Sequence, residues 1–342
     1  MFTVVYVVVD DEKLVYYNEM MKSLTSLRMH MPEQKAAVLM DSDTCDRLYQ
    51  KNSPIFDMAE VVSVKIGDDY SLVEKSRLLK ITARERVKGD LLYIDTDTVI
   101  CQRLPEIDTN KSIGMVLDLH SLRSEINWYL TDEYDKQSGL DLHNFDYFYN
   151  GGLVWSRDDE HAHRFYQKWH ALWEQTRKRG IPRDQSPLNY IVQEEFEHIE
   201  TLDGVWNAQL ARAFSIGLNY LADAYIIHYF NHATSAYLLC KEEYKNLPYD
   251  DPKILEMLKT PKSLFDKCRL IRLDAQNHSE DKEFLDWCEN QYRFRRYMKM
   301  YKPIENSEVM KLAYSLSLHP SLFHVIDKCL GFMRRVKHFM IR

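Results

Sequence analysis

Short apolar runs alternate with segments of helical periodicity over the first hundred residues. The apolar runs, which predict strands, lie at residues 2–9, 36–40, 61–64 and 91–94. Amphipathic spacing between them predicts helices at residues 14–27 and 71–87. This alternation predicts an α/β fold with helices on both sides of the sheet. Residues 91–94 are all aliphatic or β-prone, which is typical of a central strand buried on both faces.

The pattern loosens after residue 97. An apolar run at residues 113–118 predicts another strand, and the polar stretch from His120 to Asp146 predicts a long binding loop. The later pattern predicts helices at 158–176 and 183–190, a short strand at 224–230, and only helices beyond about residue 245. We therefore expect an α/β domain at residues 1–244 and a helical, basic region at residues 245–342.

Two carboxylates follow the fourth predicted strand. Asp95 and Asp97 lie one residue apart where the chain leaves Ile94, and they repel each other unless a cation or a proton lies between them. Hard oxygen ligands at the carboxyl edge of an α/β sheet indicate a site for Mg²⁺ or Mn²⁺ and a phosphate group. The alternative is a loop with two solvated aspartates.

Composition excludes several classes of protein. The 342 residues are 45% apolar and 28% charged, with only 10 Gly and 10 Pro, which argues against a disordered chain or a repeat array. The six cysteines have no zinc-ligand spacing and indicate reduced thiols in a cytoplasmic protein. The apolar start has no basic leader and is too short for a signal peptide or a membrane span, so it predicts a strand.

Charge is distributed unevenly along the chain. The formal net charge is −7, yet residues 290–342 carry 11 Lys and Arg against 3 Asp and Glu. The acidic remainder argues against general nucleic-acid binding. Cations alternate with aromatic residues at 291–302, and an apolar stripe follows at 320–342. This pattern is typical of a basic amphipathic helix on the anionic inner face of a membrane, although a helical bundle packed on the α/β domain is the alternative.

Seven short motifs occur in a fixed order along residues 2–230. They are Asp10-Asp11, Ser76-Arg77-Leu78, Tyr93-Ile94-Asp95-Thr96-Asp97, Asn150-Gly151-Gly152, Asp184-Gln185, Trp206-Asn207 and Ile226-Ile227-His228-Tyr229. In this order they resemble the retaining glycosyltransferases of family 8, such as lipopolysaccharide galactosyltransferases. The resemblance implies a GT-A fold with a Rossmann-like mixed sheet. It also implies sugar transfer from a nucleotide diphosphate, expected to be a UDP-sugar, to a glycan or lipid-linked glycan.

The resemblance implies that Asp95, Asp97 and His228 bind a metal ion. A divalent cation held there would absorb the negative charge that develops on the departing nucleotide diphosphate. Asp with neutral His suits Mn²⁺ better than Mg²⁺, because imidazole nitrogen is a softer ligand than Mg²⁺ prefers. The alternatives are that His228 is a core histidine, or that His232 is the ligand.

The resemblance assigns other residues to donor binding. Asp10 and Asp11 would bind the base and the ribose, unless they only cap the next helix. Ser76 and Arg77 precede the metal motif, and Arg77 would bind a phosphate or the donor sugar. Its alternative role is a surface ion pair with Glu74 or another carboxylate.

Three further residues complete the donor site that the resemblance implies. Thr96 lies between the two metal-binding aspartates, and Asn150 with Gly151 would hold the sugars near the reacting centre. A β-turn is the alternative for the Asn-Gly-Gly segment.

Asp184 and Gln185 are the catalytic pair that the resemblance implies. A retaining transfer needs a nucleophile on the far face of the donor sugar, or a front-face route in which the leaving phosphate accepts the proton of the acceptor. Gln185 matches the amide that the family places near that face, and Asp184 would bind a sugar hydroxyl. The alternative is that both residues only cap a helix.

The chain departs from the family pattern at two points. The His-x-x-Gly-x-x-Lys-Pro-Trp ending is absent after His228, so the lysine that contacts the diphosphate in the family is unassigned, and Lys241 is a candidate for it. Ser186 stands where many relatives carry a second Asp. These departures leave the donor sugar open.

Two other functions fit parts of the sequence. Residues 94–99 also match the nucleophile motif of haloacid-dehalogenase-type phosphatases, in which Asp95 would attack phosphorus and Asp97 would handle the proton. That motif normally ends the first strand of its fold, whereas roughly 90 residues of predicted strand and helix units precede Asp95 here. A catalytically inactive member that binds a nucleotide or a glycan is the third possibility.

Overall fold

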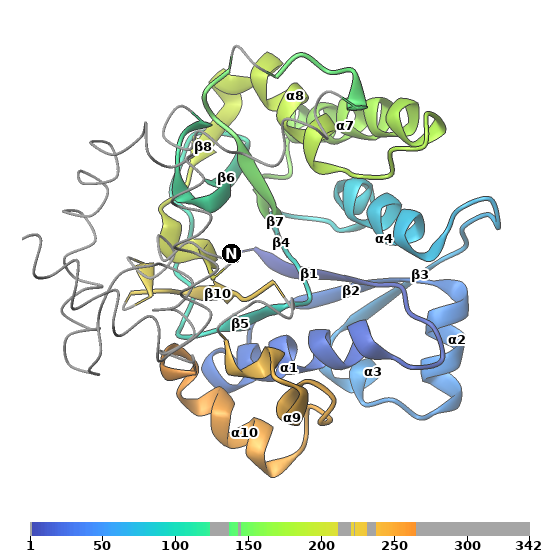
Figure 1. Ribbon diagram of the computed structural model, residues 1–342, viewed down its shortest axis with the longest axis vertical. Coiled ribbons are helices and arrows are strands. Elements are labelled where there is room, and N and C mark those ends of the chain that lie inside the picture. The colour runs from blue at the N-terminus through green and yellow to red at the C-terminus, as the bar shows by residue number, and fades with distance from the viewer. Residues whose placement is uncertain are drawn as a thin grey trace, which may run out of the picture.

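The computed structural model describes residues 2–123, 137–142, 145–210, 220–221, 223–230 and 237–264. The larger sheet has seven strands in the order β3-β2-β1-β4-β7-β6-β8, and the smaller has three in the order β5-β10-β9 (Figure 1). The strands are β1 (Thr3–Val8), β2 (Ala36–Asp41), β3 (Glu60–Val64), β4 (Leu91–Ile94), β5 (Thr98–Ile100), β6 (Ile113–Leu117), β7 (Tyr149–Ser156), β8 (Ile199–Thr201), β9 (Ala208–Gln209) and β10 (Ile226–His228). The described α-helices are α1 (Val15–His30), α2 (Ser42–Gln50), α3 (Ile55–Met58), α4 (Leu72–Ile81), α5 (Ala83–Arg86), α7 (Glu160–Lys178), α8 (Gln185–Glu194), α9 (Glu242–Lys245) and α10 (Pro252–Lys259).

The larger sheet is mixed. β1 pairs in parallel with β2 and β4, and β2 pairs in parallel with β3. β7 then runs antiparallel to both β4 and β6. β4 is the middle strand and all four of its residues are buried, so the predicted central strand is confirmed. The predicted α/β class, with a mixed sheet flanked by helices, is also confirmed.

Helices cover both faces of the larger sheet (Figure 1). One face packs against the apolar side of α1, which contributes Met20, Leu24 and Leu27. The opposite face packs against the aromatic stripe of α7, which contributes Phe165, Trp169 and Trp173. The spacing predicted a helix at residues 158–176, and burial of this stripe removes large apolar areas from water.

The predicted helix at residues 71–87 is divided in two. Ser71 begins α4 with a capping box, in which its hydroxyl accepts from the N–H of Glu74 and the Glu74 side chain accepts from the N–H of Ser71. The helix ends at Ile81, and the hydroxyl of the C-cap residue Thr82 donates to the carbonyl of Leu78 at 2.6 Å and competes with the helical hydrogen bonds. The shorter α5 follows, so the prediction was wrong about the length of one helix.

The end of the described chain packs against α1. The Lys22 ammonium of α1 donates to the carbonyls of Tyr244 (3.1 Å) and Lys245 (3.0 Å) at the end of α9. The predicted boundary after residue 244 therefore falls inside α9, and the division into two domains stays a prediction. The basic segment 290–342 and much of the predicted loop at 120–146 lie outside the described residues. Among the described helices, none combines the length and the apolar character that crossing a membrane requires.

Candidate active site

The smaller sheet brings the two predicted metal-binding segments together. Asp95 and Asp97 lie in the loop between β4 and β5, and β5 pairs antiparallel with β10 so that Thr98 is opposite His228. The N–H of Asp95 donates to the carbonyl of Gly152 at 2.9 Å, and the carbonyl of Asp97 accepts from the N–H of Tyr229 at 3.0 Å. Backbone pairing therefore fixes this loop on both sides, and the predicted adjacency of the two segments is confirmed.

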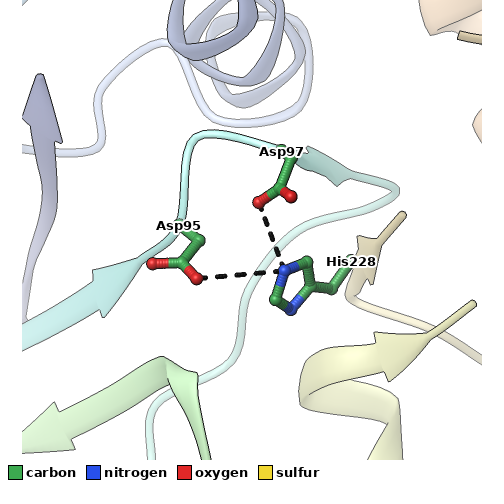
Figure 2. A group of neighbouring side chains, drawn as sticks. All are labelled: Asp95, Asp97 and His228. Atoms are coloured by element: carbon green, nitrogen blue, oxygen red, sulfur yellow. Dashed lines mark ion pairs between the residues drawn. The ribbon is translucent and has the colours of Figure 1, made fainter. Parts of the chain in front are cut away.

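The three side chains converge on one point (Figure 2). The His228 Nε2 atom lies 3.2 Å from Asp97 Oδ1 and 3.9 Å from Asp95 Oδ2. One ligand atom from each residue falls within 4.8 Å of the others. The His228 side chain is only 2% exposed, whereas Asp95 and Asp97 are 25% and 21% exposed. Two carboxylates and an imidazole that face a partly open point fit a divalent cation.

The two carboxylates also affect the protonation of His228. Burial lowers the pKa of His228, but the carboxylates of Asp97 and Asp95 outweigh that effect and raise its pKa above the ordinary value. The Phe230 ring stacks on the imidazole with a centroid distance of 3.8 Å and an interplanar angle of 10°. Phe230 has a φ of 50°, which is uncommon for a bulky residue, so the backbone accepts some strain where the imidazole is held.

Gly151 and Gly152 keep two sides of the site open. A Cβ atom on Gly152 would lie 2.4 Å from His228 Cε1 and 2.8 Å from Asp95 Oδ2. A Cβ atom on Gly151 would lie 3.2 Å from the Lys80 Nζ atom. Successive residues of a strand face opposite sides of a sheet. The missing side chain of Gly152 therefore leaves space for His228 and Asp95, and the missing side chain of Gly151 leaves space for Lys80 on the other face of β7. The glycine pair is therefore part of a strand, and the predicted alternative of a β-turn was wrong.

Asp184 is held by two cations from α4. Its Oδ2 atom lies 2.9 Å from Lys80 Nζ, and its Oδ1 atom lies 3.2 Å from Arg77 Nε. Burial raises the pKa of Asp184, but Lys80 and Arg77 outweigh this effect, and the pKa falls to about 2. Asp184 is the N-cap residue of α8, yet its side chain makes no capping hydrogen bond. The capping alternative is therefore wrong for this carboxylate.

A second polar group surrounds Gln185. The Asp118 carboxylate at the end of β6 accepts a hydrogen bond from Asn150 Nδ2 at 2.7 Å and another from the Gln185 side chain. Asn207 Nδ2 donates to Asn150 Oδ1 at 3.2 Å. Burial raises the pKa of Asp118 to about 6, against the effect of these hydrogen bonds. Gln185 and Asn150, which were predicted separately, thus share one carboxylate.

The sequence analysis missed Lys80 and Asp118. Asp118 follows an apolar run just as Asp95 does, so its position at a strand end was an available signal. Lys80 lies one helical turn after Arg77, and two cations at that spacing share a face of α4. Neither signal identifies the partner, because those contacts depend on how β4, β7 and β6 pair.

The predicted nucleotide-binding residues have local roles in the structure. Asp10 is buried, and its carboxylate accepts from the N–H groups of Tyr17 (2.8 Å) and Asp11 (3.0 Å), which fixes the start of α1 as the capping alternative states. Asp11 is exposed and accepts from the N–H of Lys13 at 2.8 Å. Arg77 pairs with Asp184, while Glu74 belongs to the capping box of α4. Binding of a base, ribose or phosphate by these residues stays a prediction.

The remaining candidates are placed as follows. Ser76 in α4 and Thr96 between the two aspartates are half-buried. Ser186 is buried in α8, and Lys241 is the N-cap residue of α9. His232 lies outside the described residues.

Comparisons with known proteins return matches only among solved structures. No protein-family model and no curated protein sequence matches the chain. The galactosyltransferase LgtC in complex with donor and acceptor sugar analogues is 12% identical, with a TM-score of 0.48 over 78% of this chain and 98% of that chain. The glycosyltransferase GlyE of Streptococcus pneumoniae TIGR4 is 16% identical, with a TM-score of 0.46 over 78% of this chain and 66% of that one. Mouse xyloside xylosyltransferase 1 in its apo form is 14% identical, with a TM-score of 0.43 over 66% of this chain and 97% of that one.

Proposed function

We propose that this protein is a metal-dependent glycosyltransferase of the GT-A type. It moves a sugar from a nucleotide diphosphate, expected to be a UDP-sugar, to a glycan or lipid-linked glycan with retention of configuration. The observation that carries the proposal is the convergence of Asp95, Asp97 and His228, with Asp184 linked to Asp95 through a shared contact with Lys80. A cation site beside buried polar groups is what transfer from a charged donor needs.

Asp95, Asp97 and His228 would hold Mn²⁺, or Mg²⁺ in its place. When bound there, the cation supplies Lewis-acid stabilisation of the diphosphate leaving group. The protein's own contribution is to orient the ligands. Tyr93 donates its hydroxyl to Asp95 Oδ1 at 2.5 Å, which leaves Oδ2 directed toward His228. Outer contacts of this kind fix ligand geometry in metal sites.

The ion pairs of Asp184 favour the front-face route to retention. A carboxylate with a pKa of about 2 that is shared by Lys80 and Arg77 is a weak base and a poor nucleophile. In the proposed step the bond between the anomeric carbon and the phosphate oxygen breaks, and the acceptor oxygen bonds to the same face of that carbon. The acceptor proton passes to the phosphate oxygen. Gln185 and Asp184 then orient the sugar instead of attacking it.

A donor screen tests the proposal. The full-length protein is incubated with Mn²⁺ and a set of nucleotide sugars, and both hydrolysis and transfer are measured. We expect turnover of at least one UDP-sugar, loss of turnover on removal of the metal, and loss of metal-dependent turnover in Asp97→Asn. A folded protein that neither turns over nor binds any nucleotide sugar would contradict the proposal. Binding without turnover would instead identify an inactive nucleotide-binding or glycan-binding protein.

The phosphatase alternative is disfavoured by position in the fold. Asp95 follows β4, which is the fourth strand along the chain and the middle strand of the larger sheet. The nucleophile of that phosphatase family follows the first strand. The Oδ1 atom of Asp95 also accepts from Tyr93 and lies 3.8 Å from Lys80.

We further propose that the basic segment 290–342 attaches the enzyme to the inner face of a membrane. Its 11 Lys and Arg against 3 Asp and Glu would attract anionic lipid headgroups, which suits an enzyme whose acceptor is lipid-linked. Flotation with anionic vesicles compares the full-length protein with a variant truncated after residue 289. We expect only the full-length protein to float, and equal flotation would refute the proposal.

A further inference from the structure

Lys80 is a buried lysine between two acidic groups. Its side chain is only 5% exposed, and lysine is rarely buried unless its charge is paired. The Nζ atom lies 2.9 Å from Asp184 Oδ2 and 3.8 Å from Asp95 Oδ1. It also lies 5.0 Å from the centroid of the Tyr93 ring, within the range of a cation–π contact. One ammonium therefore joins a predicted metal ligand to a predicted sugar-binding carboxylate.

Neutralisation of Asp184 does not by itself explain this lysine. Arg77, one turn earlier in α4, already pairs with Asp184 Oδ1 at 3.2 Å. The contact that only Lys80 adds is the one to Asp95. That contact lies on Oδ1, while Oδ2 faces His228 at 3.9 Å. The two oxygens of Asp95 are thus divided between the lysine side and the metal side.

The charges in the site depend on what is bound. Asp95, Asp97 and Asp184 carry three negative charges, and Lys80 with Arg77 supplies two positive ones. A divalent cation placed between Asp95 and Asp97 would be repelled by the nearby ammonium of Lys80. The negative charge of a nucleotide diphosphate would offset the combined positive charge of the cation and Lys80. The cation and the nucleotide would therefore each strengthen the binding of the other.

We infer that Lys80 is a positioning residue that holds Asp95 and Asp184 together and weakens binding of the cation until a nucleotide diphosphate is present. This inference rests on the proposed metal site and donor class. Its consequence is that the enzyme binds Mn²⁺ and nucleotide cooperatively, and that Lys80 is one source of the coupling.

Mn²⁺ binding to the intact chain tests the inference, measured by the electron paramagnetic resonance signal of free Mn²⁺ with and without UDP. The neutral variants Lys80→Met and Lys80→Gln should bind Mn²⁺ alone about tenfold more tightly, because a repulsion across a few ångströms is removed. UDP should then enhance their Mn²⁺ affinity less than it does in the wild type. Lys80→Arg, which keeps the charge, should behave like the wild type.

Lys75→Met is the matched control. Lys75 is another buried lysine of α4, and it pairs with Asp41 and Asp43 at 3.4 Å each, not with the residues of the candidate site. It should leave Mn²⁺ affinity unchanged, whereas a general loss of structure would weaken binding in every variant. Unchanged or weaker Mn²⁺ binding in folded Lys80→Met and Lys80→Gln would overturn the inference. Absence of Mn²⁺ binding in the wild type would instead overturn the proposed function.

Discussion

Replacing Gly152 with alanine tests whether the site depends on space at β7. The added Cβ would lie 2.4 Å from His228 Cε1, and 2.8 Å from Asp95 Oδ2 and Asn150 Oδ1. Carbon atoms in favourable contact lie about 3.5–4.0 Å apart, so the imidazole or the strand must shift by roughly 1 Å. The backbone of Gly152 does not require a positive φ, so the effect is steric.

The expected losses follow from the size of that shift. Overpacking of this kind costs about 1–3 kcal/mol of stability, which thermal or urea unfolding measures. Displacement of supporting contacts costs about 10–100-fold in metal affinity, and a misplacement of ~1 Å costs about 100-fold in turnover. We therefore expect Gly152→Ala to fold, to bind Mn²⁺ at least tenfold more weakly, and to be nearly inactive.

Gly114→Ala provides the comparison. Gly114 lies in β6 of the same sheet, and the three atoms nearest to its added Cβ would be side-chain carbons of Leu202, at 3.2–3.3 Å. The variant should lose some stability while Mn²⁺ affinity stays within twofold of the wild type. Gly151→Ala should lose less stability than Gly152→Ala, because its Cβ meets the end of the flexible Lys80 side chain at 3.2 Å. Gly152→Ala with wild-type Mn²⁺ affinity would refute the reasoning that the glycine makes room for the metal ligands.

Three further predictions concern the same site. Asp184 has a pKa of about 2 in the folded protein, against an ordinary value near 4. Its ionised form therefore adds about 2–3 kcal/mol to the free energy of unfolding above pH 4, and this contribution is lost as the pH falls toward 2. Urea unfolding across that range should show this loss in the wild type and not in Asp184→Asn, and equal pH profiles would contradict it. Asp118 has the opposite shift, with a pKa of about 6, so its contribution to stability is full below pH 4 and falls as the pH rises through 6. Asp118→Asn should therefore gain about 1–3 kcal/mol at pH 8 relative to pH 4, and a constant difference between the two pH values would refute this cause. Tyr93→Phe removes the donor to Asp95 Oδ1 and should weaken Mn²⁺ binding about 10–100-fold, measured as free Mn²⁺; an unchanged affinity would show that Asp95 is oriented without it.

The parallel strands of the larger sheet were predictable because the residues of each strand identify it without reference to its neighbours. β1, β2, β3 and β4 are apolar runs separated by helical spacing, and each could be identified without knowing its neighbours. The antiparallel insertion of β7 between β4 and β6 depends on pairing between segments far apart in the chain. Pairing of that kind leaves little trace in the local pattern, so the composition of the site around Asn150 could not be read from spacing.

The candidate site was predictable in part for the same reason. Asp95 and Asp97 stand out because two carboxylates interrupt apolar sequence. His228 follows an apolar run that predicts only a buried strand, and its link to the aspartates came from the family resemblance. Lys80 was not identified because a lysine within a helix usually lies in solvent. Its buried position is defined by contacts with other elements, namely Asp184 at the start of α8 (2.9 Å) and the Tyr93 ring of β4 (5.0 Å).

The pairing of β10 with β5 also has a consequence for protein engineering. The backbone places residue 228 opposite Thr98 through strand pairing that does not involve its side chain, so the position of the residue does not depend on the imidazole. If the proposed metal site binds a cation, position 228 is a point at which its metal preference can be redesigned. A carboxylate there would complete an all-oxygen set suited to Mg²⁺, and a thiolate would favour Zn²⁺. The smaller sheet thus holds the third candidate ligand position next to Asp95 and Asp97 through backbone pairing.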